Sequence, residues 1–221
     1  MKEFALFSYF RSSASYRVRI ALGLKGIDYE YRAVHLLNDG GEQLKTDYAA
    51  LNPSREVPTL VHRKNGQEIL IGQSVAIVDY LDRVAPSPLL FPHDPVERAK
   101  VLQVCEVINS GIQPLHNLRV LKTLTTKFGA SEEQKNEWTR HWLLYGLETL
   151  EQLLAPTARA FSFGDAPGAA DCFLIPNLAN ADRFHVDLAP FPTLRRIREA
   201  CEKLPAFVQA SPTKVPDSPN T

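Results

Sequence analysis

The strongest constraint on this chain is the change from a strand to a helix within its first 26 residues. Residues 4–9 (FALFSY) are short, aromatic-rich and bounded by polar residues, which predicts a strand. Apolar residues then recur at helical spacing over residues 14–22, and Lys25-Gly26 is typical of a helix end. Three hydroxyl side chains therefore lie at or beside the start of this helix: Ser12, Ser13 and Ser15.

This serine turn is suited to hold an anion. The first turn of a helix has free backbone N–H groups and the positive end of the helix dipole. Position 14 is an alanine, so the turn supplies no thiol of its own, and the anion would come from a ligand. The alternative is that the serines are only N-caps, which is the commoner role for any single serine.

The first third of the chain alternates between strand and helix signals. Residues 29–35 form an alternating strand candidate, and residues 42–50 predict a weak helix. Two further strand segments, 59–62 and 68–71, flank an Asn-Gly pair that marks a hairpin, and a helix with i, i+3, i+4, i+7 spacing follows over 77–84. A βαβ unit followed by a hairpin and a helix predicts a thioredoxin-like domain.

Beyond residue 95 the pattern changes to long helices. Residues 85–95 contain four prolines and are a plausible boundary. An apolar stripe then runs over 101–115, where Pro114 predicts a kink or break. Further helices are expected over 131–155, 169–184 and 192–204, and the proline-containing tail 211–221 is expected to be loose or draped on the surface. The predicted domains are 1–84, a linker 85–95, and an all-helical domain 96–221.

Composition excludes several classes of function. Lys plus Arg and Asp plus Glu both number 25, so no net field attracts nucleic acid or an anionic membrane. The three cysteines lie far apart without metal-ligand or disulfide spacing, and no metal site is expected. There is no signal-peptide core and no apolar run long enough to span a membrane, so a cytoplasmic location is expected.

The run SSASYRVRIALGLKGIDYE, residues 12–30, resembles the zeta class of glutathione transferases, which includes maleylacetoacetate and maleylpyruvate isomerases. Further similar segments cover nearly the whole chain: ALNPSREVPTL, GQSVAIVDYLD, GIQPLHNLRVLK, FGDAPGAADC and ADRFHVDLAPFP. This chain departs from the usual pattern at Ala14, where members carry cysteine, and at Tyr16, where they carry tryptophan. The resemblance implies the glutathione transferase fold, an α/β thioredoxin-like N-terminal domain plus an all-α C-terminal domain.

The resemblance also implies that glutathione is the cofactor. Ser12 is the first choice for the hydroxyl that keeps the glutathione thiol ionised, with Ser13 and Ser15 behind it. Val57, before a proline that is cis in this fold, would pair its backbone with the peptide, although an ordinary strand-initiating proline is the alternative. Gln73 and Ser74 would bind the γ-glutamyl carboxylate, where Ser74 is in any case expected as an N-cap. Gln43 would contact the glycyl end.

A small dicarboxylic acid is the substrate that the resemblance implies. Arg11 and Arg183 suit such a molecule because each guanidinium can grip a carboxylate with two hydrogen bonds, although either arginine alone is more often a solvated surface residue. Gln113 and Asn117 are expected one turn apart on the first long helix, where family members line the site.

The implied activity is cis–trans isomerisation of maleylacetoacetate-type acids, in which a thiolate adds to the alkene, the single bond rotates and elimination follows. Ala14 should then be compatible with activity, because the sulfur belongs to glutathione. Alternatives are a maleylpyruvate isomerase, a general zeta-class transferase or dehalogenase, and a non-catalytic module. The resemblance also implies a homodimer.

Overall fold

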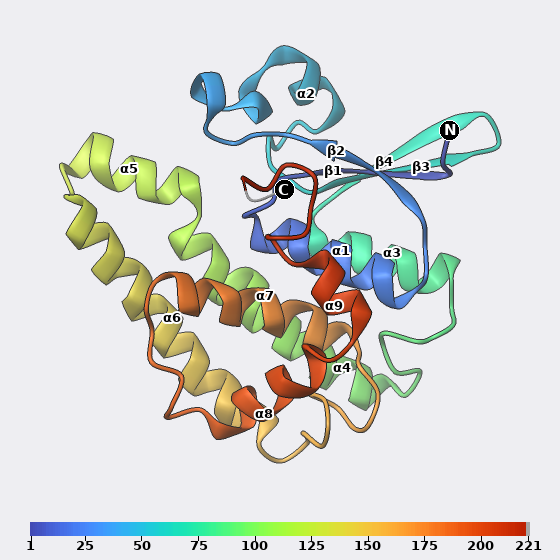
Figure 1. Cartoon of the computed structure of the whole chain (residues 1–221), viewed down its shortest axis with the longest axis vertical. Helices are drawn as coiled ribbons and strands as arrows, with labels where there is room; N and C mark the ends of the chain where they lie inside the picture. The colour runs from blue at the N-terminus through green and yellow to red at the C-terminus, as the bar shows by residue number, and fades with distance from the viewer. Residues whose placement is uncertain (220–221) are drawn as a thin grey trace. The chain divides into compact units, whose positions relative to one another are not determined.

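The chain begins with a four-stranded mixed sheet, in a computed structural model that describes residues 1–219. The strands are β1 (Phe4–Ser8), β2 (Tyr29–Ala33), β3 (Thr59–Lys64) and β4 (Gln67–Gly72), in the order β2-β1-β3-β4 (Figure 1). Strand β1 runs parallel to β2 and antiparallel to β3, and β3 pairs with β4 in the predicted hairpin. Asn65 and Gly66 both have positive φ, 53° and 76°, as a tight two-residue hairpin turn requires.

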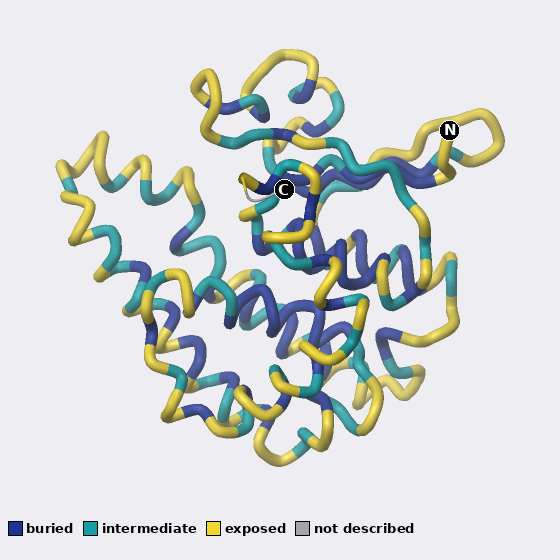
Figure 2. The backbone as a smooth tube through the Cα atoms, in the orientation of Figure 1, coloured by how far each residue is buried: buried dark blue, intermediate teal, exposed yellow. Residues whose placement is uncertain are grey.

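Helices cover both faces of this sheet. Helices α1 (Ser13–Leu24) and α3 (Ser74–Val84) lie together on one face, and α2 (Thr46–Leu51) lies on the other side of the strands (Figure 1). The predicted helix over 42–50 is divided, because the 3-10 turns η1 (Asn38–Gly40) and η2 (Glu42–Leu44) precede α2. Helix α1 and strand β1 are the most continuously buried elements around the sheet (Figure 2). The thioredoxin-like prediction is confirmed.

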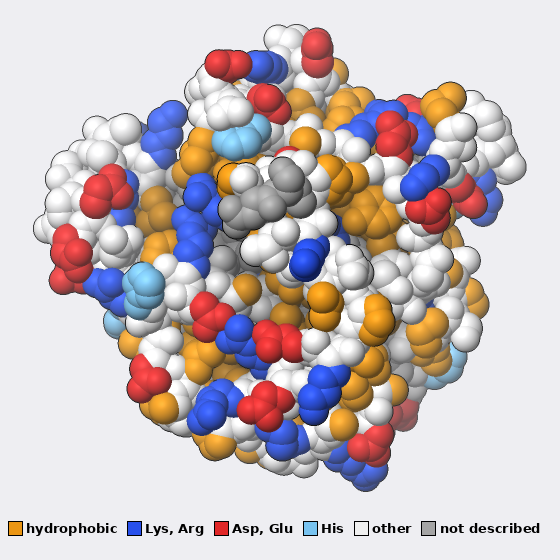
Figure 3. Space-filling view, viewed as in Figure 1, with side chains coloured by type: hydrophobic (Ala, Val, Ile, Leu, Met, Phe, Trp, Pro, Cys, Tyr) orange, Lys and Arg blue, Asp and Glu red, His pale blue; other side chains and the backbone are white. Residues whose placement is uncertain are grey.

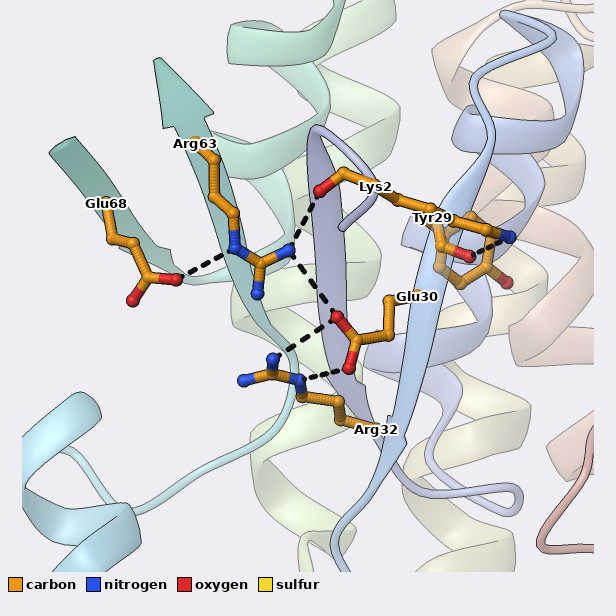
Figure 4. Close-up of polar contacts among 6 residues, drawn as sticks. All are labelled: Lys2, Tyr29, Glu30, Arg32, Arg63 and Glu68. Carbon is orange, nitrogen blue, oxygen red and sulfur yellow. Dashed lines mark hydrogen bonds and ion pairs between the residues drawn. The ribbon is translucent and has the colours of Figure 1, made fainter. Parts of the chain in front are cut away.

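Strands β2, β3 and β4 are linked by a network of charged side chains (Figure 4). Arg63 on β3 donates from Nε to Glu68 Oε1 at 2.9 Å and from Nη1 to Glu30 Oε2 at 3.4 Å. The hydrogen bond from Arg32, with the nearby charges, holds the pKa of Glu30 below its ordinary value. The glutamates of these pairs are partly exposed, which limits what the pairs contribute to stability.

The C-terminal segment returns to the first unit of the structure. That unit comprises residues 1–90 together with the segment that follows Cys201, and the second unit comprises residues 91–201. Helix α9 (Pro205–Ala210) packs on α1, and the Tyr16 hydroxyl donates to the Phe207 carbonyl at 3.3 Å. This division differs from the predicted ranges, which placed the segment in the helical domain. Of the two alternatives expected for the tail, loose or draped on the surface, residues 211–219 follow the second, with Val215 and Ser218 buried. Residues 220 and 221 lie outside the described residues.

The second unit is helical, as predicted. Its elements are α4 (Pro95–Glu106), a π-helical turn η3 (Val107–Ile112), a 3-10 turn η4 (Gln113–His116), α5 (Leu118–Phe128), α6 (Glu132–Leu154), α7 (Ala169–Arg183) and α8 (Pro192–Cys201). All three cysteines are buried, and none of them forms a disulfide bond. The Asp171 carboxylate accepts from the Gly168 N–H at 2.8 Å and so caps α7, where the cap residue itself has no side chain to do so. Burial raises the pKa of Asp171.

The face drawn in Figure 3 carries charges of both signs side by side, and the chain as a whole has a formal net charge of zero. Among residues 1–219, no helix is both long and apolar enough to cross a membrane. Within the same residues, no group of three or more histidine, cysteine, aspartate or glutamate side chains is placed to hold a metal ion.

Candidate active site

Ser12 caps the N-terminus of helix α1, and its hydroxyl proton remains available to donate. Its backbone is extended, with φ −70° and ψ 116°, and its Oγ accepts a hydrogen bond from the Ser15 N–H at 3.1 Å. The N-cap prediction is therefore confirmed. A serine hydroxyl has one proton to donate as well as lone pairs that accept. Because the cap uses only a lone pair, the O–H can still donate to an anion at this helix end.

The neighbouring serines are more deeply placed. Ser13 and Ser15 are buried, whereas Ser12 and Ala14 are half-exposed. Ser15 Oγ has no hydrogen-bond partner among the described residues. The partial exposure of Ser12 makes it the hydroxyl of the three best placed to meet a ligand.

Helix α3 begins at Ser74, one residue earlier than a serine cap would place it. Gln73, not Ser74, is the cap residue, with φ 66°, and its side chain makes no cap hydrogen bond, so the prediction of a Ser74 N-cap is wrong. Ser74 is the first helical residue and is buried. Its Oγ accepts from Arg17 Nη1 at 3.0 Å. A helix N-terminus and a guanidinium charge therefore lie at one hydroxyl, which favours a carboxylate there.

Arg17 is the site residue that sequence reasoning missed. It is 1% exposed, although it lies in the charged pattern Arg-Val-Arg of α1, where solvent exposure is the usual outcome for arginine. The available signal is its position among the apolar residues Tyr16 and Val18 on a helix that must pack against the sheet. Its partner Ser74 is distant in sequence, so the pairing itself has no local signal.

The segment before β3 has the predicted cis peptide bond, between Val57 and Pro58. Two buried side chains hold the preceding backbone in place. Tyr48 Oη donates to the Glu56 carbonyl at 2.7 Å, and Asn52 Nδ2 donates to the same carbonyl at 2.9 Å. Asn52 Nδ2 also lies 3.0 Å from Thr59 Oγ1. These hydrogen bonds fix the backbone immediately before Val57.

Gln43 lies in the turn η2 with a buried side chain whose Oε1 has no hydrogen-bond partner among the described residues. Gly41 before it has φ 112°, and a Cβ at that position would come within 2.7 Å of Gln43 Nε2. Glu42 Oε2 accepts from the His35 N–H at 2.6 Å, which ties the turn to the end of β2. The positive φ favours glycine at position 41, and any larger residue there would also displace the end of the Gln43 side chain.

Contacts link these segments into one region of the first unit. The Tyr9 ring, three residues before Ser12, packs in one cluster with Val57 and lies edge-on to His35 at 4.9 Å between centroids. Gln73 Nε2 reaches Glu56 Oε2 at 3.4 Å. Residues near Ser12, Val57 and Gln73 are thus connected within the first unit, close to where β1 ends.

Arg11 is exposed in the loop before Ser12. Its guanidinium carbon lies 5.6 Å from the centroid of the Phe10 ring and 5.9 Å from that of Tyr9. These aromatic faces orient the side chain and leave its N–H groups able to bind an anion.

The remaining predicted residues lie in the second unit. The prediction that Gln113 and Asn117 share one long helix is wrong: α4 ends at Glu106, and Pro114 lies in a 3-10 turn after the π-helical turn. Asn117 is extended and caps α5, accepting from the Arg119 N–H at 3.1 Å. Arg183 is exposed in the last turn of α7, over the Phe184 ring at 5.0 Å.

A ring contact relates these two parts of the second unit. His116 of η4 lies 6.5 Å from Phe184, the residue after Arg183. The structure thus brings η4 and the end of α7 together, although by a route different from the one that the sequence predicted.

The sheet and its flanking helices belong to a known class of protein. Residues 11–84 match the family described as Glutathione S-transferase, N-terminal domain, and residues 146–210 match Glutathione S-transferase, C-terminal domain. The chain belongs to the glutathione S-transferase family.

Its relatives lie within the zeta class. The chain is 45% identical over 214 residues to the maleylacetoacetate isomerase of Rattus norvegicus, covering 97% of this chain and 94% of the relative. A holo structure of a bacterial zeta-class maleylpyruvate isomerase is 42% identical, with a TM-score of 0.91 over 97% of this chain and 99% of that one.

A third relative is known with ligands. The maleylacetoacetate isomerase of Anaeromyxobacter dehalogenans 2CP-1 is 42% identical, with a TM-score of 0.87 over 99% of this chain and 100% of that one. Its structure has dicarboxyethyl glutathione and citrate bound in the active site.

Proposed function

We propose that this protein is a glutathione-dependent cis–trans isomerase of maleylacetoacetate-type dicarboxylic acids. The observation that carries the proposal is the Ser12 turn, a half-exposed hydroxyl with a free proton at the start of α1, in a chain with alanine at position 14. Such a turn stabilises a thiolate that it does not itself supply. Near-full-length relatives named maleylacetoacetate and maleylpyruvate isomerase support this choice within the family.

Residues of the first unit fit glutathione. A tripeptide with two carboxylates and an extended backbone needs anion sites and a backbone partner. The N-terminus of α3, with Ser74 and Arg17, suits the γ-glutamyl carboxylate. Val57 offers peptide groups on a segment fixed by hydrogen bonds, in the manner of strand addition. The buried Gln43 Oε1, which has no partner among residues 1–219, is an acceptor for the glycyl part.

When bound, glutathione supplies the sulfur that adds to the alkene carbon and leaves again after rotation about the resulting single bond. Ser12 donates its O–H toward that sulfur, and the first turn of α1 adds the field of its free N–H groups. Both effects lower the thiol pKa from its ordinary value of about 8.5. Ser13 and Ser15 support the turn from within, since both are buried.

The arginines are proposed to bind the substrate. Arg11 and Arg183 each present an exposed guanidinium steadied by an aromatic ring, which suits bidentate binding of a carboxylate. Positive charge beside the substrate also stabilises the negative charge that develops on addition. Gln113 and Asn117 are proposed as polar contacts from the second unit.

Maleylpyruvate isomerase is the second candidate, because relatives of both names match this chain at similar identity. The two activities share the same chemistry and differ in substrate length. Side-by-side rates on maleylpyruvate and maleylacetoacetate decide between them.

The proposal is tested by following the ultraviolet spectrum of each acid with enzyme, in the presence and absence of glutathione. We expect turnover only with glutathione, no net consumption of the thiol, and activity despite Ala14. Equal turnover without glutathione contradicts the assignment. A stable thioether product in place of the trans acid supports a conjugating transferase, and absence of glutathione binding supports a non-catalytic module.

We also propose a homodimer and a cytoplasmic location, both from resemblance to the family. Sedimentation of the purified protein tests the first, because a dimer has twice the 24.7 kDa mass of the chain.

A further inference from the structure

The C-terminal segment is hydrogen-bonded to the loop that carries Ser12. Asp217 Oδ2 accepts from the Phe10 N–H at 2.9 Å, and Asp217 Oδ1 accepts from the Tyr31 hydroxyl at 2.6 Å. Phe10 lies two residues before Ser12, in the loop between β1 and α1. A carboxylate from near the end of the chain therefore fixes the backbone at the entrance to the serine turn.

Arg19 also donates hydrogen bonds to this loop. This side chain is 1% exposed, and its guanidinium donates to the Tyr9 carbonyl at 3.3 Å and to the Phe10 carbonyl at 3.2 Å. It also donates from Nε to the Ala210 carbonyl at 2.8 Å, where helix α9 ends. One buried cation thus joins two loop carbonyls to the C-terminal segment.

Burying the Arg19 guanidinium costs desolvation free energy, which its hydrogen bonds to several carbonyl acceptors offset. Burial lowers the pKa of Arg19, and the nearby charge of Asp217 opposes that shift. A buried arginine persists when its N–H groups are hydrogen-bonded. The carbonyls that satisfy Arg19 come both from the loop and from α9, so loss of either group leaves donors unsatisfied.

Packing keeps the C-terminal segment in place against the first unit. Phe207 of α9 is 1% exposed, and Val215 and Ser218 are also buried. The backbone on either side of Asp217 is already ordered by this packing. Forming the hydrogen bonds of Asp217 to the loop therefore costs little additional conformational entropy.

From this arrangement we propose that residues 205–219 position the Ser12 turn, with Asp217 and Arg19 as the positioning residues. Neither touches a reacting atom. They act by fixing the Tyr9–Phe10 backbone, and through it the Ser12 hydroxyl. The catalytic meaning of this proposal rests on the proposed isomerase function. A shift of about 1 Å in a positioned group can cost roughly a hundredfold in rate.

The test compares Asp217→Ala with Tyr31→Phe, each in the full chain. Asp217→Ala removes the acceptor for the Phe10 N–H, whereas Tyr31→Phe removes only the other hydrogen bond of the same carboxylate. The first measurement is hydrogen–deuterium exchange of the peptide covering residues 9–16, without ligand. The second is the thiol pKa of bound glutathione, with kcat and KM for the isomerase reaction.

In Asp217→Ala, we expect at least tenfold faster exchange in residues 9–16, a raised thiol pKa, and a fall in kcat larger than the rise in KM for glutathione. In Tyr31→Phe, we expect exchange close to that of the wild type. Exchange and thiol pKa both unchanged in a folded Asp217→Ala overturn the proposal, even if the melting temperature falls.

Asp217→Asn keeps one side-chain oxygen for the Phe10 N–H, and we expect its exchange to lie between those of the wild type and Asp217→Ala. If Asp217→Ala does not fold, wild-type exchange in Asp217→Asn overturns the proposal. If the wild type does not isomerise either acid but the exchange difference is present, the proposed function is wrong and the positioning role is still supported. Isomerisation by the wild type without the exchange difference in Asp217→Ala overturns the positioning role and leaves the proposed function in place.

Discussion

The cap observed at Ser12 and the role that we propose for its hydroxyl are compatible. Its lone pair caps helix α1 through the Ser15 N–H, and its proton is left to donate. The sequence left the cap and the functional role as alternatives, and the geometry shows that they do not compete. The cap orients the side chain at the helix end, where a donated proton acts together with the helix dipole.

Residues whose role depends on distant partners could not be predicted. Arg17 and Arg19 both lie within the run of α1, and their pattern looks like an ordinary charged helix face. Their burial follows from acceptors 57 residues away at Ser74 and 191 residues away at Ala210. Local periodicity contains no information about such partners, so Ser12 could be proposed from sequence while its supports could not.

Three tyrosines should resist ionisation. Burial raises the pKa of Tyr29, Tyr31 and Tyr48, and for Tyr31 the hydrogen bond to Asp217 adds to the rise. In the unfolded chain each ionises near pH 10. The stability that these raised values confer is complete below that pH and is lost as the pH rises further, because only the unfolded state releases protons.

Absorbance of tyrosinate, followed together with circular dichroism as the pH is raised, checks this expectation. We expect part of the absorbance of the seven tyrosines to appear only with unfolding. Tyr31→Phe should reduce the alkaline loss of stability. Ionisation of all seven near pH 10 in a protein that stays folded contradicts the shifts.

Elements with strong local signals were predictable. The Asn-Gly hairpin, helix α1 and the long helix α6 all follow from turn chemistry or periodicity, and the structure confirms them. The conformation of residues 107–117 could not be predicted, because Pro114 indicates a break in the helix but does not specify the backbone before it. A π-helical turn and a 3-10 turn replace the expected helix, and α5, which has no buried residue, was not predicted separately.

The π-helical turn depends on a small residue in α6. A Cβ at Gly146 would overlap Ile112 Cδ1 and Cγ1 in η3. We expect Gly146→Ala to destabilise the protein by about 1–3 kcal/mol, the usual cost of overpacking. Because Ile112 immediately precedes Gln113, the variant should also weaken substrate binding.

Gly111→Ala is the matched control, since a Cβ there meets nothing within 4 Å. It lies in the same turn and should change the free energy of unfolding by less than about 0.5 kcal/mol. Urea unfolding of both variants measures the difference. Equal stability of the two variants would show that η3 moves freely away from α6.

At the scale of the whole molecule, the chain leaves its first unit, builds a helical unit and returns. Sequence reasoning divided the chain at the proline-rich linker and placed everything after it in one domain. It erred at the end because a short, proline-containing segment has too little periodicity to reveal packing. The segment is ordered by apolar contacts and by Arg19, both supplied by residues at the start of the chain.

Phe207→Ala should therefore destabilise the first unit although Phe207 follows the second unit in sequence. Phe207 is 1% exposed in the packing of α9 on α1, and truncating a buried phenylalanine costs about 3–5 kcal/mol. Val208→Ala, at a residue 38% exposed on the same helix, should have a small effect.

Hydrogen exchange resolved by peptide locates the change. We expect faster exchange in α1 for Phe207→Ala, with smaller changes in α6. The account of the C-terminal segment fails if exchange rises in α6 and not in α1.

The central claim is that the Ser12 turn ionises a bound thiol, and spectroscopic titration of glutathione on the enzyme measures it directly. We compare the wild type with Ser12→Ala and with Ser131→Ala, which also removes a serine N-cap, that of α6. The wild type and Ser131→Ala should share a thiol pKa below about 8.5, and Ser12→Ala should raise it, with kcat falling roughly a hundredfold. The same thiol pKa in all three proteins would contradict the claim.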